Sequence, residues 1–220
     1  EKYEYSVCFA DFQTQGRGRG SNQWLSPYGS GICFSVIGSL YSKSSPLGLS
    51  IYCGIIISRA LRDLGYSGAS LKWPNDLLHG GKKLGGILVE LTSQSQDYYS
   101  FNIGVGINYD IGSDLNSMAE NLFPPTDLLK INHDLSLCRS EMSGILARTV
   151  IESLKKFNQR SIQSAFKFWP EYDALFEKEV KIIEENDILE GKNIGIDHTG
   201  ALLLDDNGVI KKVYNGHLVI

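Results

Sequence analysis

The chain has 220 residues, of which 42% are hydrophobic and 21% are charged, and this composition excludes disorder over most of its length. Its formal net charge of -4 excludes the broadly positive surface that would draw a chain onto nucleic acid or an anionic membrane. The 23 glycines are many for this length, and glycine is usually found where backbone turns sharply or lies close to a ligand.

Apolar runs and turn residues predict strands and one long helix in the first half of the chain. Ser45 and Pro46 predict the start of that helix, and Gly65 predicts its end. Gly80 and Gly81 predict a hairpin turn between two strands. A polar, glycine-rich loop is expected at residues 14–30. The predicted strands are residues 5–13, 31–40, 69–73, 76–79, 83–91 and 98–109.

The second half of the chain reads differently. We expect an irregular stretch at 110–132, a long helix from about 134 to 157, and a short helix at 162–169 that ends at Pro170. The last segment has strand-length apolar runs that are broken by turn dipeptides such as Asn-Gly, which is typical of a small β-barrel. We therefore place a domain boundary near residue 176, between a main domain (1–176) and a small barrel (177–220).

The segment QTQGRGRGSNQW, residues 13–24, alternates glycine with arginine. The planar guanidinium group matches carboxylate and phosphate oxygens, and glycine lets backbone N–H groups approach an anion. The alternatives are a solvated RGG-like segment that binds nucleic acid and a plain flexible loop. The motif occurs once, in an acidic chain and between two apolar strands, which favours a loop that covers a ligand.

A second segment joins KWPND, residues 72–76, to GKKLGGILVE, residues 81–90. Adjacent glycines weaken a strand and are usually tolerated where something else approaches the backbone. Lys83 precedes this glycine pair and is predicted to point at a ligand, whereas Lys82 is better explained as a solvated lysine of a surface hairpin. Asp76 is a candidate ligand for Mg²⁺, which prefers one or two carboxylates together with phosphate oxygens.

The third segment, GVGIN, leaves one face of a strand without side chains. A bulge or a crowded crossing would explain this pattern equally well. The sequence has neither a GxxxxGK[ST] phosphate loop nor a GxGxxG helix start, and its four histidines are dispersed. Anion-binding glycines, a lysine, an amide and an acid favour phosphoryl or nucleotidyl transfer through charge stabilisation.

Taken together, GRGRG with Trp24 and Ser26-Pro27, KWPND, KLGGILVE and GVGIN resemble the biotin–protein ligase family in order and spacing. The resemblance extends from about residue 5 to the C-terminus. It implies an α/β (α+β) fold, with a mixed-sheet catalytic domain and an SH3-like β-barrel. It also implies the reaction: biotin and MgATP give biotinyl-5′-AMP and pyrophosphate, and the biotin then passes to a lysine of a biotin carboxyl carrier protein of acetyl-CoA carboxylase or a related biotin-dependent carboxylase.

The resemblance also implies roles for individual residues. Arg19 and Lys83 are expected to be catalytic, with Lys83 reaching both the biotin carboxylate and the α-phosphate. Asn75 and Asn108 are expected on the nucleotide side of the site, and Asp76 at the Mg²⁺ ion. The residues expected to bind biotin or its adenylate are Gln13, Gly16, Arg17, Gly18, Arg19, Trp24, Lys83, Gly86 and Gly104.

Two departures from the family pattern accompany the resemblance. The family has an upstream Ser-Thr-Asn segment that contacts biotin, and this chain begins after that point, so we expect the N-terminal part of the catalytic domain to be missing. Gly20, Ser21 and Asn22 replace the more basic stretch of some members. This weakens any inference about ligand-linked dimerisation and leaves a homodimer open.

Three rival functions remain to be weighed. A lipoate–protein ligase uses related adenylation chemistry on a similar fold, although GRGRG with KWPND favours biotin. Some family members are also DNA-binding repressors, but no basic pair of helices lies within these 220 residues, so we expect a monofunctional ligase without nucleic acid. A purely structural module is the least favoured. The start carries no signal-peptide pattern, and the apolar stretch 47–64 contains charges, so we expect a cytoplasmic protein without a membrane span.

Overall fold

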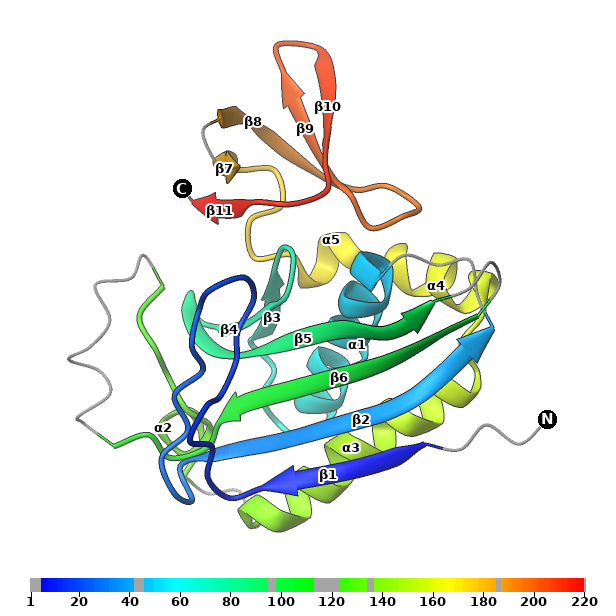
Figure 1. The fold of residues 1–220 in the computed structure, drawn as a ribbon. Helices are drawn as coiled ribbons and strands as arrows, with labels where there is room; N and C mark the ends of the chain where they lie inside the picture. Colours follow the sequence, from blue (N-terminus) through cyan, green and yellow to red (C-terminus); the bar gives the residue numbers. More distant parts are fainter. Residues whose placement is uncertain are drawn as a thin grey trace.

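The computed structural model describes residues 5–41, 46–94, 98–112, 123–133, 137–184 and 187–219. Two antiparallel sheets organise these residues (Figure 1). A six-stranded sheet carries helices on one of its faces, and a five-stranded sheet formed by the C-terminal part of the chain lies beyond its β5 and β3 side. The expected α/β fold class is confirmed.

The six-stranded sheet has the order β1-β2-β6-β5-β4-β3. Every pairing between these neighbouring strands is antiparallel, so the expected mixed sheet contains no parallel neighbours among its named strands. Its strands are β1 (Ser6–Ala10), β2 (Gly31–Tyr41), β3 (Ala69–Lys72), β4 (Asp76–His79), β5 (Lys82–Gln94) and β6 (Tyr98–Asn108). The Gly80-Gly81 hairpin is confirmed between β4 and β5, with both residues at positive φ.

Side chains alternate between the two faces of these strands, as the pleat of a strand requires. On β6, Ile103, Val105 and Ile107 are buried against the helices. The intervening residues, Gly104 and Gly106, lie on the opposite face. The sheet thus has an apolar face that packs on helices and an open face that is poor in side chains.

Helices α1 (Pro46–Asp63) and α3 (Arg139–Lys155) cover the apolar face. Helix α1 packs on β5 and β3, and α3 packs on β2. The predicted end of α1 is confirmed, because Gly65 has a φ of +96° and so terminates the helix in the left-handed region. The predicted capping residue, Ser45, lies outside the described residues. No described helix is long and apolar enough to span a membrane.

Three shorter helices complete this part, and two of them correct predictions. Pro170 does not end a helix; it lies in the first turn of α5 (Trp169–Tyr172), where proline's missing N–H is not needed by the helix. A short helix also lies within the stretch predicted to be irregular: α2 (Leu128–Ile131), capped by Asp127, which accepts a hydrogen bond from the Lys130 N–H at 2.8 Å. The remaining helix is α4 (Gln159–Phe166).

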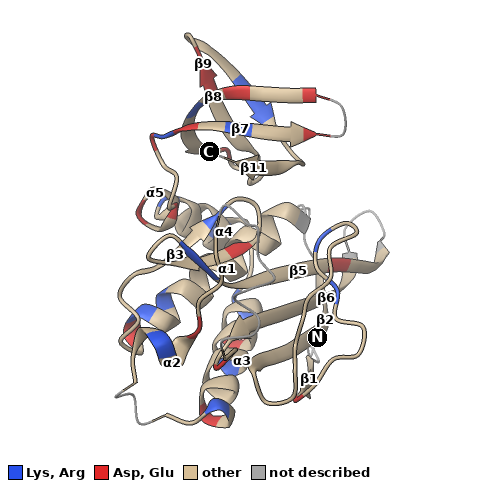
Figure 2. Ribbon diagram, turned by 90° about the vertical axis from the view of Figure 1, so that its left-hand side faces the viewer, with Lys and Arg blue, Asp and Glu red and all other residues tan. Residues whose placement is uncertain are grey.

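The C-terminal strands form the five-stranded sheet, in the order β10-β9-β8-β7-β11. The turn between β9 and β10 uses Asn207 and Gly208 at positive φ, as an Asn-Gly hairpin requires. The strands are β7 (Glu179–Glu184), β8 (Asp187–Ile196), β9 (Leu202–Asp206), β10 (Val209–Val213) and β11 (His217–Val219). Among the described residues no pairing joins β10 to β11, so the expected barrel is seen as an open sheet. Figure 2 shows acidic and basic residues on the five-stranded sheet, whereas β2 and β6 of the six-stranded sheet carry none.

Buried polar groups fix the junction between the two sheets. The Asp173 carboxylate accepts hydrogen bonds from the Trp169 indole at 2.9 Å and from the Asn193 amide on β8 at 2.8 Å. Burial raises the pKa of Asp173, and these hydrogen bonds oppose the rise. A second link is the Trp73 indole N–H, which donates to the Gly200 carbonyl at 3.0 Å. The C-terminal sheet is therefore held against the end of β3, while the domain boundary near residue 176 stays a prediction.

Candidate active site

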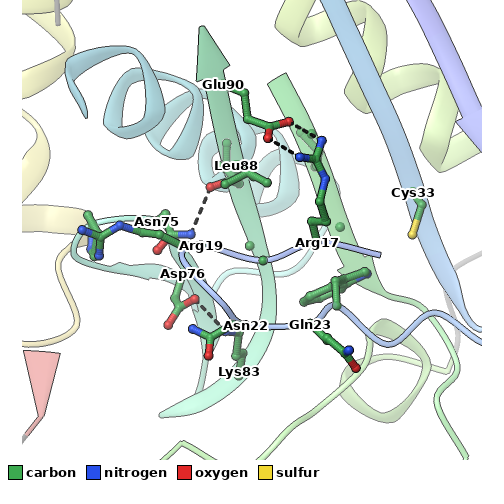
Figure 3. A pocket seen from close by; sticks show the side chains of 18 of the residues that line it. Arg17, Arg19, Asn22, Gln23, Cys33, Asn75, Asp76, Lys83, Leu88 and Glu90 are labelled. Atoms are coloured by element: carbon green, nitrogen blue, oxygen red, sulfur yellow. Dashed lines mark hydrogen bonds and ion pairs between the residues drawn. The ribbon is translucent and has the colours of Figure 1, made fainter. Parts of the chain in front are cut away.

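A cavity of about 780 Å³ lies on the open face of the six-stranded sheet. Its floor is formed by β1, β2, β5 and β6, and the loop at residues 13–24 passes over it. Residues 72–76 line one side of the cavity, and Gly216 together with β11 of the C-terminal sheet lines another. Figure 3 shows the charged side chains of the loop and of β5 around this space.

Glycines on β5 and β6 carry no side chain, so at these positions the floor of the cavity is formed by backbone. Gly86 on β5 lies opposite Gly106 on β6, and the next cavity-facing pair is Leu88 and Gly104. A Cβ atom at Gly106 would lie 2.5 Å from Cε2 of Trp24, so the indole ring packs directly on this glycine. A Cβ atom at Gly104 would meet nothing closer than 3.8 Å. Gly106 therefore seats Trp24, whereas Gly104 leaves open space for a ligand.

A cluster of two lysines and one carboxylate lies at one end of the cavity. The Asp76 carboxylate contacts Nζ of Lys83 at 2.7 Å and Nζ of Lys72 at 3.0 Å. Burial alone would raise the pKa of Asp76, but the two ammonium groups outweigh it and hold that pKa below its usual value. Two cations share one anion here, so the cluster leaves a surplus positive charge for an anionic ligand.

The chain around Lys83 is held by its backbone and by Asn108. The Lys83 N–H donates to the Pro124 carbonyl at 2.8 Å, and the Thr126 N–H donates to the Lys83 carbonyl at 2.9 Å. The Asn108 amide donates to the Thr126 carbonyl at 2.9 Å and, at 3.4 Å, to the Lys83 carbonyl. Asn108 thus steadies the start of β5 and is not among the residues that line the cavity.

The loop over the cavity is a small hairpin. The Trp24 N–H donates to the Gly16 carbonyl at 2.9 Å, and the Gly18 N–H donates to the Asn22 carbonyl at 2.8 Å. A Cβ atom at Gly16 would lie 2.2 Å from the Trp24 carbonyl oxygen. Glycine is therefore required at position 16 by the hairpin itself, and Gly16 is not among the lining residues.

The two arginines of the hairpin reach different partners. Arg17 forms a two-pronged ion pair with Glu90 on β5, at 2.7 and 2.8 Å. Arg19 donates to the Gly216 carbonyl at 2.7 Å and also to the Asn215 side chain, so it contacts the C-terminal part of the chain. Burial lowers the pKa of Arg19, and the Asp76 and Glu184 carboxylates oppose this. Figure 3 shows the two side chains pointing apart.

Most residues predicted for the site are brought together. Gln13, Asn75 and Asp76 line the cavity, and the Asn75 amide also donates to the Ile87 carbonyl of β5 at 3.1 Å. Gly16 and Asn108 do not line it. The other predicted residues that do are Arg17, Gly18, Arg19, Trp24, Lys83, Gly86 and Gly104.

Sequence reasoning missed several lining residues. Glu90 and Gly106 share the strand parity of Gly86 and Gly104, so alternation places them on the same faces as those glycines, although neither was named as a site residue. Lys72 belongs to the KWPND segment, but only its ion pair with Asp76 shows that it faces the cavity. The contribution of Gly216 had no signal in the sequence, because it depends on how the C-terminal sheet packs on the first.

Comparisons with known proteins agree on one family. Residues 1–108 match the model of the Biotin/lipoate A/B protein ligase family, and residues 175–217 match the Biotin protein ligase C terminal domain. The bifunctional ligase/repressor BirA of Escherichia coli (strain K12) is 34% identical over 213 residues, covering 96% of this chain and 65% of that protein. The biotin protein ligase 1, chloroplastic, of Arabidopsis thaliana is 30% identical, covering 92% and 56% respectively.

The fold agrees as well. A biotin protein ligase from Aquifex aeolicus, solved in complex with biotin and ATP, superposes with a TM-score of 0.79 at 29% identity and covers 97% of this chain. This chain covers 87% of that one. Against the bacterial ligase/repressors, the chain spans about 65% of their length.

Proposed function

The chain belongs to the biotin protein ligase family, and from this premise we propose that it attaches biotin to a lysine of a carrier protein, using ATP and passing through biotinyl-5′-AMP. One observation carries the proposal: a glycine-floored cavity ends in a cluster of Lys72, Asp76 and Lys83 and lies under an arginine-bearing loop. The cavity's volume of about 780 Å³ is in the range of pockets that hold small organic ligands.

In the first half-reaction, an oxygen of the biotin carboxylate attacks the α-phosphorus of ATP. The P–O bond to the β-phosphate breaks, so biotinyl-5′-AMP forms and pyrophosphate leaves. Two anions must approach each other in this step, and fixed positive charges lower the cost of that approach without having to move. Lys83 and Lys72 supply such charges at one end of the cavity.

In the second half-reaction, the neutral amine of the carrier lysine attacks the carbonyl carbon of the adenylate. AMP leaves, and the nitrogen loses a proton to give the amide. The adenylate is a mixed anhydride that water can hydrolyse, so it must be covered until the acceptor arrives. The hairpin with Arg17 and Arg19 lies over the cavity and provides such a cover.

The side chains beside the cavity fit Mg²⁺ only as an ion that arrives bound to the nucleotide. Among the described residues there is no group of three or more His, Cys, Asp or Glu that could hold a metal ion. Asp76 is a single carboxylate beside the cavity, and Mg²⁺ commonly takes one or two carboxylates together with phosphate oxygens. We therefore propose that Asp76 and the ATP phosphates would hold Mg²⁺, which would offset phosphate charge.

For the acceptor, we propose a biotin carboxyl carrier protein of acetyl-CoA carboxylase or of a related biotin-dependent carboxylase. We propose the cytoplasm as the place where it acts. The ligase activity behind this choice of acceptor is supported by the relatives, which are named as a bifunctional ligase/repressor in a bacterium and as a biotin–protein ligase in a plant. The expectation of a ligase without repressor function stays a prediction.

ATP–pyrophosphate exchange tests the proposal and separates biotin from lipoate, because the matched family model covers ligases of both. We expect labelled pyrophosphate to enter ATP only when biotin and Mg²⁺ are present. Lipoate in place of biotin should give the background rate, as should a sample with EDTA. Equal exchange without biotin, or faster exchange with lipoate, would contradict the proposal.

A further inference from the structure

The ion pair between Arg17 and Glu90 joins two segments that lie 73 residues apart in the chain. Nη1 of Arg17 lies 2.7 Å from Oε1 of Glu90, and Nη2 lies 2.8 Å from Oε2. Two parallel contacts of this kind fix the orientation of a guanidinium group as well as its position. The Arg17 side chain is otherwise 68% exposed. The carboxylate is therefore the group that orders it.

The carboxylate is itself oriented by the neighbouring strand. Glu90 on β5 lies directly opposite Asn102 on β6, and the Asn102 amide nitrogen lies 3.4 Å from Oε2. Both residues face the cavity. A free carboxylate there would repel the anionic ligands that the cavity is proposed to take, since like charges at short range disfavour each other. Pairing with Arg17 removes this repulsion.

The hairpin at residues 16–24 is thus attached at two places on opposite sides. Arg17 attaches it to β5 of the six-stranded sheet, and Arg19 attaches it to Asn215 and Gly216 beside the five-stranded sheet. Between these attachments the hairpin spans the cavity (Figure 3). Losing either one would leave the hairpin attached by the other arginine and by the packing of Trp24 on Gly106.

We propose that Glu90 is a positioning residue: it holds the hairpin across the cavity through Arg17, and it does so before any ligand binds. Both terminal nitrogens of the Arg17 guanidinium group are paired with Glu90, so Arg17 serves to place the hairpin, while Lys72, Lys83 and Arg19 are the other cations that line the cavity. The placement itself concerns the free protein. Its effect on turnover rests on the proposed function.

Hydrogen exchange in the ligand-free protein tests the placement directly. Glu90→Gln keeps the shape of the side chain and removes its charge. Partly exposed ion pairs contribute little, and two-pronged ones contribute more, so exchange of amides in residues 14–24 should quicken by about two- to tenfold. Glu152→Gln is the matched control, because it removes a comparable ion pair with Lys155 on α3, far from the cavity. It should leave residues 14–24 unchanged.

A charge swap separates pairing from a general loss of structure. Combining Arg17→Glu with Glu90→Arg restores an ion pair of opposite polarity, and the Asn102 amide can turn its oxygen toward the introduced guanidinium. We expect the double variant to recover most of the protection that each single variant loses. Unchanged exchange in Glu90→Gln, or a double variant that exchanges as fast as the faster single variant, would overturn the proposal.

A double-mutant cycle in biotin-dependent ATP–pyrophosphate exchange tests the link to turnover. If Glu90 acts only through Arg17, the double variant Arg17→Ala/Glu90→Ala should be no more impaired than Arg17→Ala alone. Effects that multiply would show that Glu90 acts on the ligand itself and would overturn the positioning role. Absence of biotin-dependent exchange in the wild-type protein would instead refute the proposed function, and the ligand-free experiment would still decide the role of Glu90.

Discussion

The two faces of the six-stranded sheet are built from the same strands, but one packs on helices and the other lines the cavity. On β6, Ile103, Val105 and Ile107 fill the space beneath the helices and are at most 3% exposed. The residues between them, Gly104 and Gly106, form the floor of the cavity. One alternating sequence therefore provides both a close-packed core and an open surface. Substitutions one residue apart on β6 should therefore alter either the stability of the protein or its binding of ligand.

The largest expected effect is on the helix-covered face. Ile103→Ala removes a fully buried side chain, and such substitutions cost about 2–5 kcal/mol of unfolding free energy. Denaturant titration measures the loss. Gly104→Ala, one residue away, should change the unfolding free energy by less than about 1 kcal/mol, because its methyl group would point into the cavity. Equal losses of unfolding free energy in the two variants would contradict the distinction between a packed face and an open face.

On the cavity side, the largest effect is expected at Lys83. Lys83→Ala removes a charged contact, worth roughly 1.5–3 kcal/mol, so adenylate formation should slow by about ten- to a hundredfold. Lys82→Ala is the matched control, because Lys82 is exposed and does not line the cavity. The measurement is ATP–pyrophosphate exchange at saturating biotin. Comparable losses in the two variants would remove Lys83 from its proposed role.

A smaller effect distinguishes the two floor glycines. Gly106→Ala would place a methyl group against the Trp24 indole, which must then move. Because the indole lies on a loop and can shift, we expect a cost of roughly 1–1.5 kcal/mol in binding free energy, which is the lower end of the range for overpacking. This corresponds to an affinity for biotin that is about five- to tenfold weaker. Calorimetric titration with biotin measures it in both glycine variants.

Gly104→Ala sharpens this result, since its methyl group would enter the open space of the cavity without touching Trp24. We expect the unliganded Trp24 fluorescence to change in Gly106→Ala and to stay as in wild type in Gly104→Ala. An unchanged spectrum in both variants would show that the indole does not rest on Gly106 in solution.

The smallest effect is a dependence on pH that comes from Asp76. Its pKa is lowered in the folded protein, so its ion pairs contribute stability that is fully present above the unfolded-state value, about 3.9, and lost as the pH falls through the folded value. Between pH 5 and 3, the unfolding free energy should fall more steeply in wild type than in Asp76→Asn. Parallel curves would contradict the lowered pKa.

Some residues of the open face could be predicted from the sequence. The adjacent glycines identified Lys83 without any structure, because a glycine pair in a strand is usually tolerated where something approaches the backbone. Gly86 and Gly104 were expected in the site from the family resemblance, and strand alternation places Gly104 on the face without side chains. The same alternation in GVGIN placed Gly106 on the face of Gly104, although Gly106 was not named as a site residue. What the rule does not provide is the partner of each side chain.

Long-range pairing explains the remaining differences. Arg17 and Glu90 are 73 residues apart, and Arg19 and Asn215 are 196 apart, so their contacts follow from sheet order and from the packing of the second sheet. Asn108 was predicted for the nucleotide side, which stays a prediction, and its amide donates to the Thr126 and Lys83 carbonyls. The end of a strand is readable from sequence, whereas the direction that its last side chain takes depends on the loop packed against it.

The central claim is that ligand binds on the open face of the sheet, beneath the hairpin. Hydrogen exchange with and without biotin and MgATP tests this most directly, because it reports on every described segment at once. We predict slower exchange in residues 13–24, 83–90 and 102–106. A second groove of about 380 Å³, between Ile56 and Asp63 of α1 and Thr149 of α3, should be unchanged. Slower exchange confined to that groove, or none at all, would contradict the account.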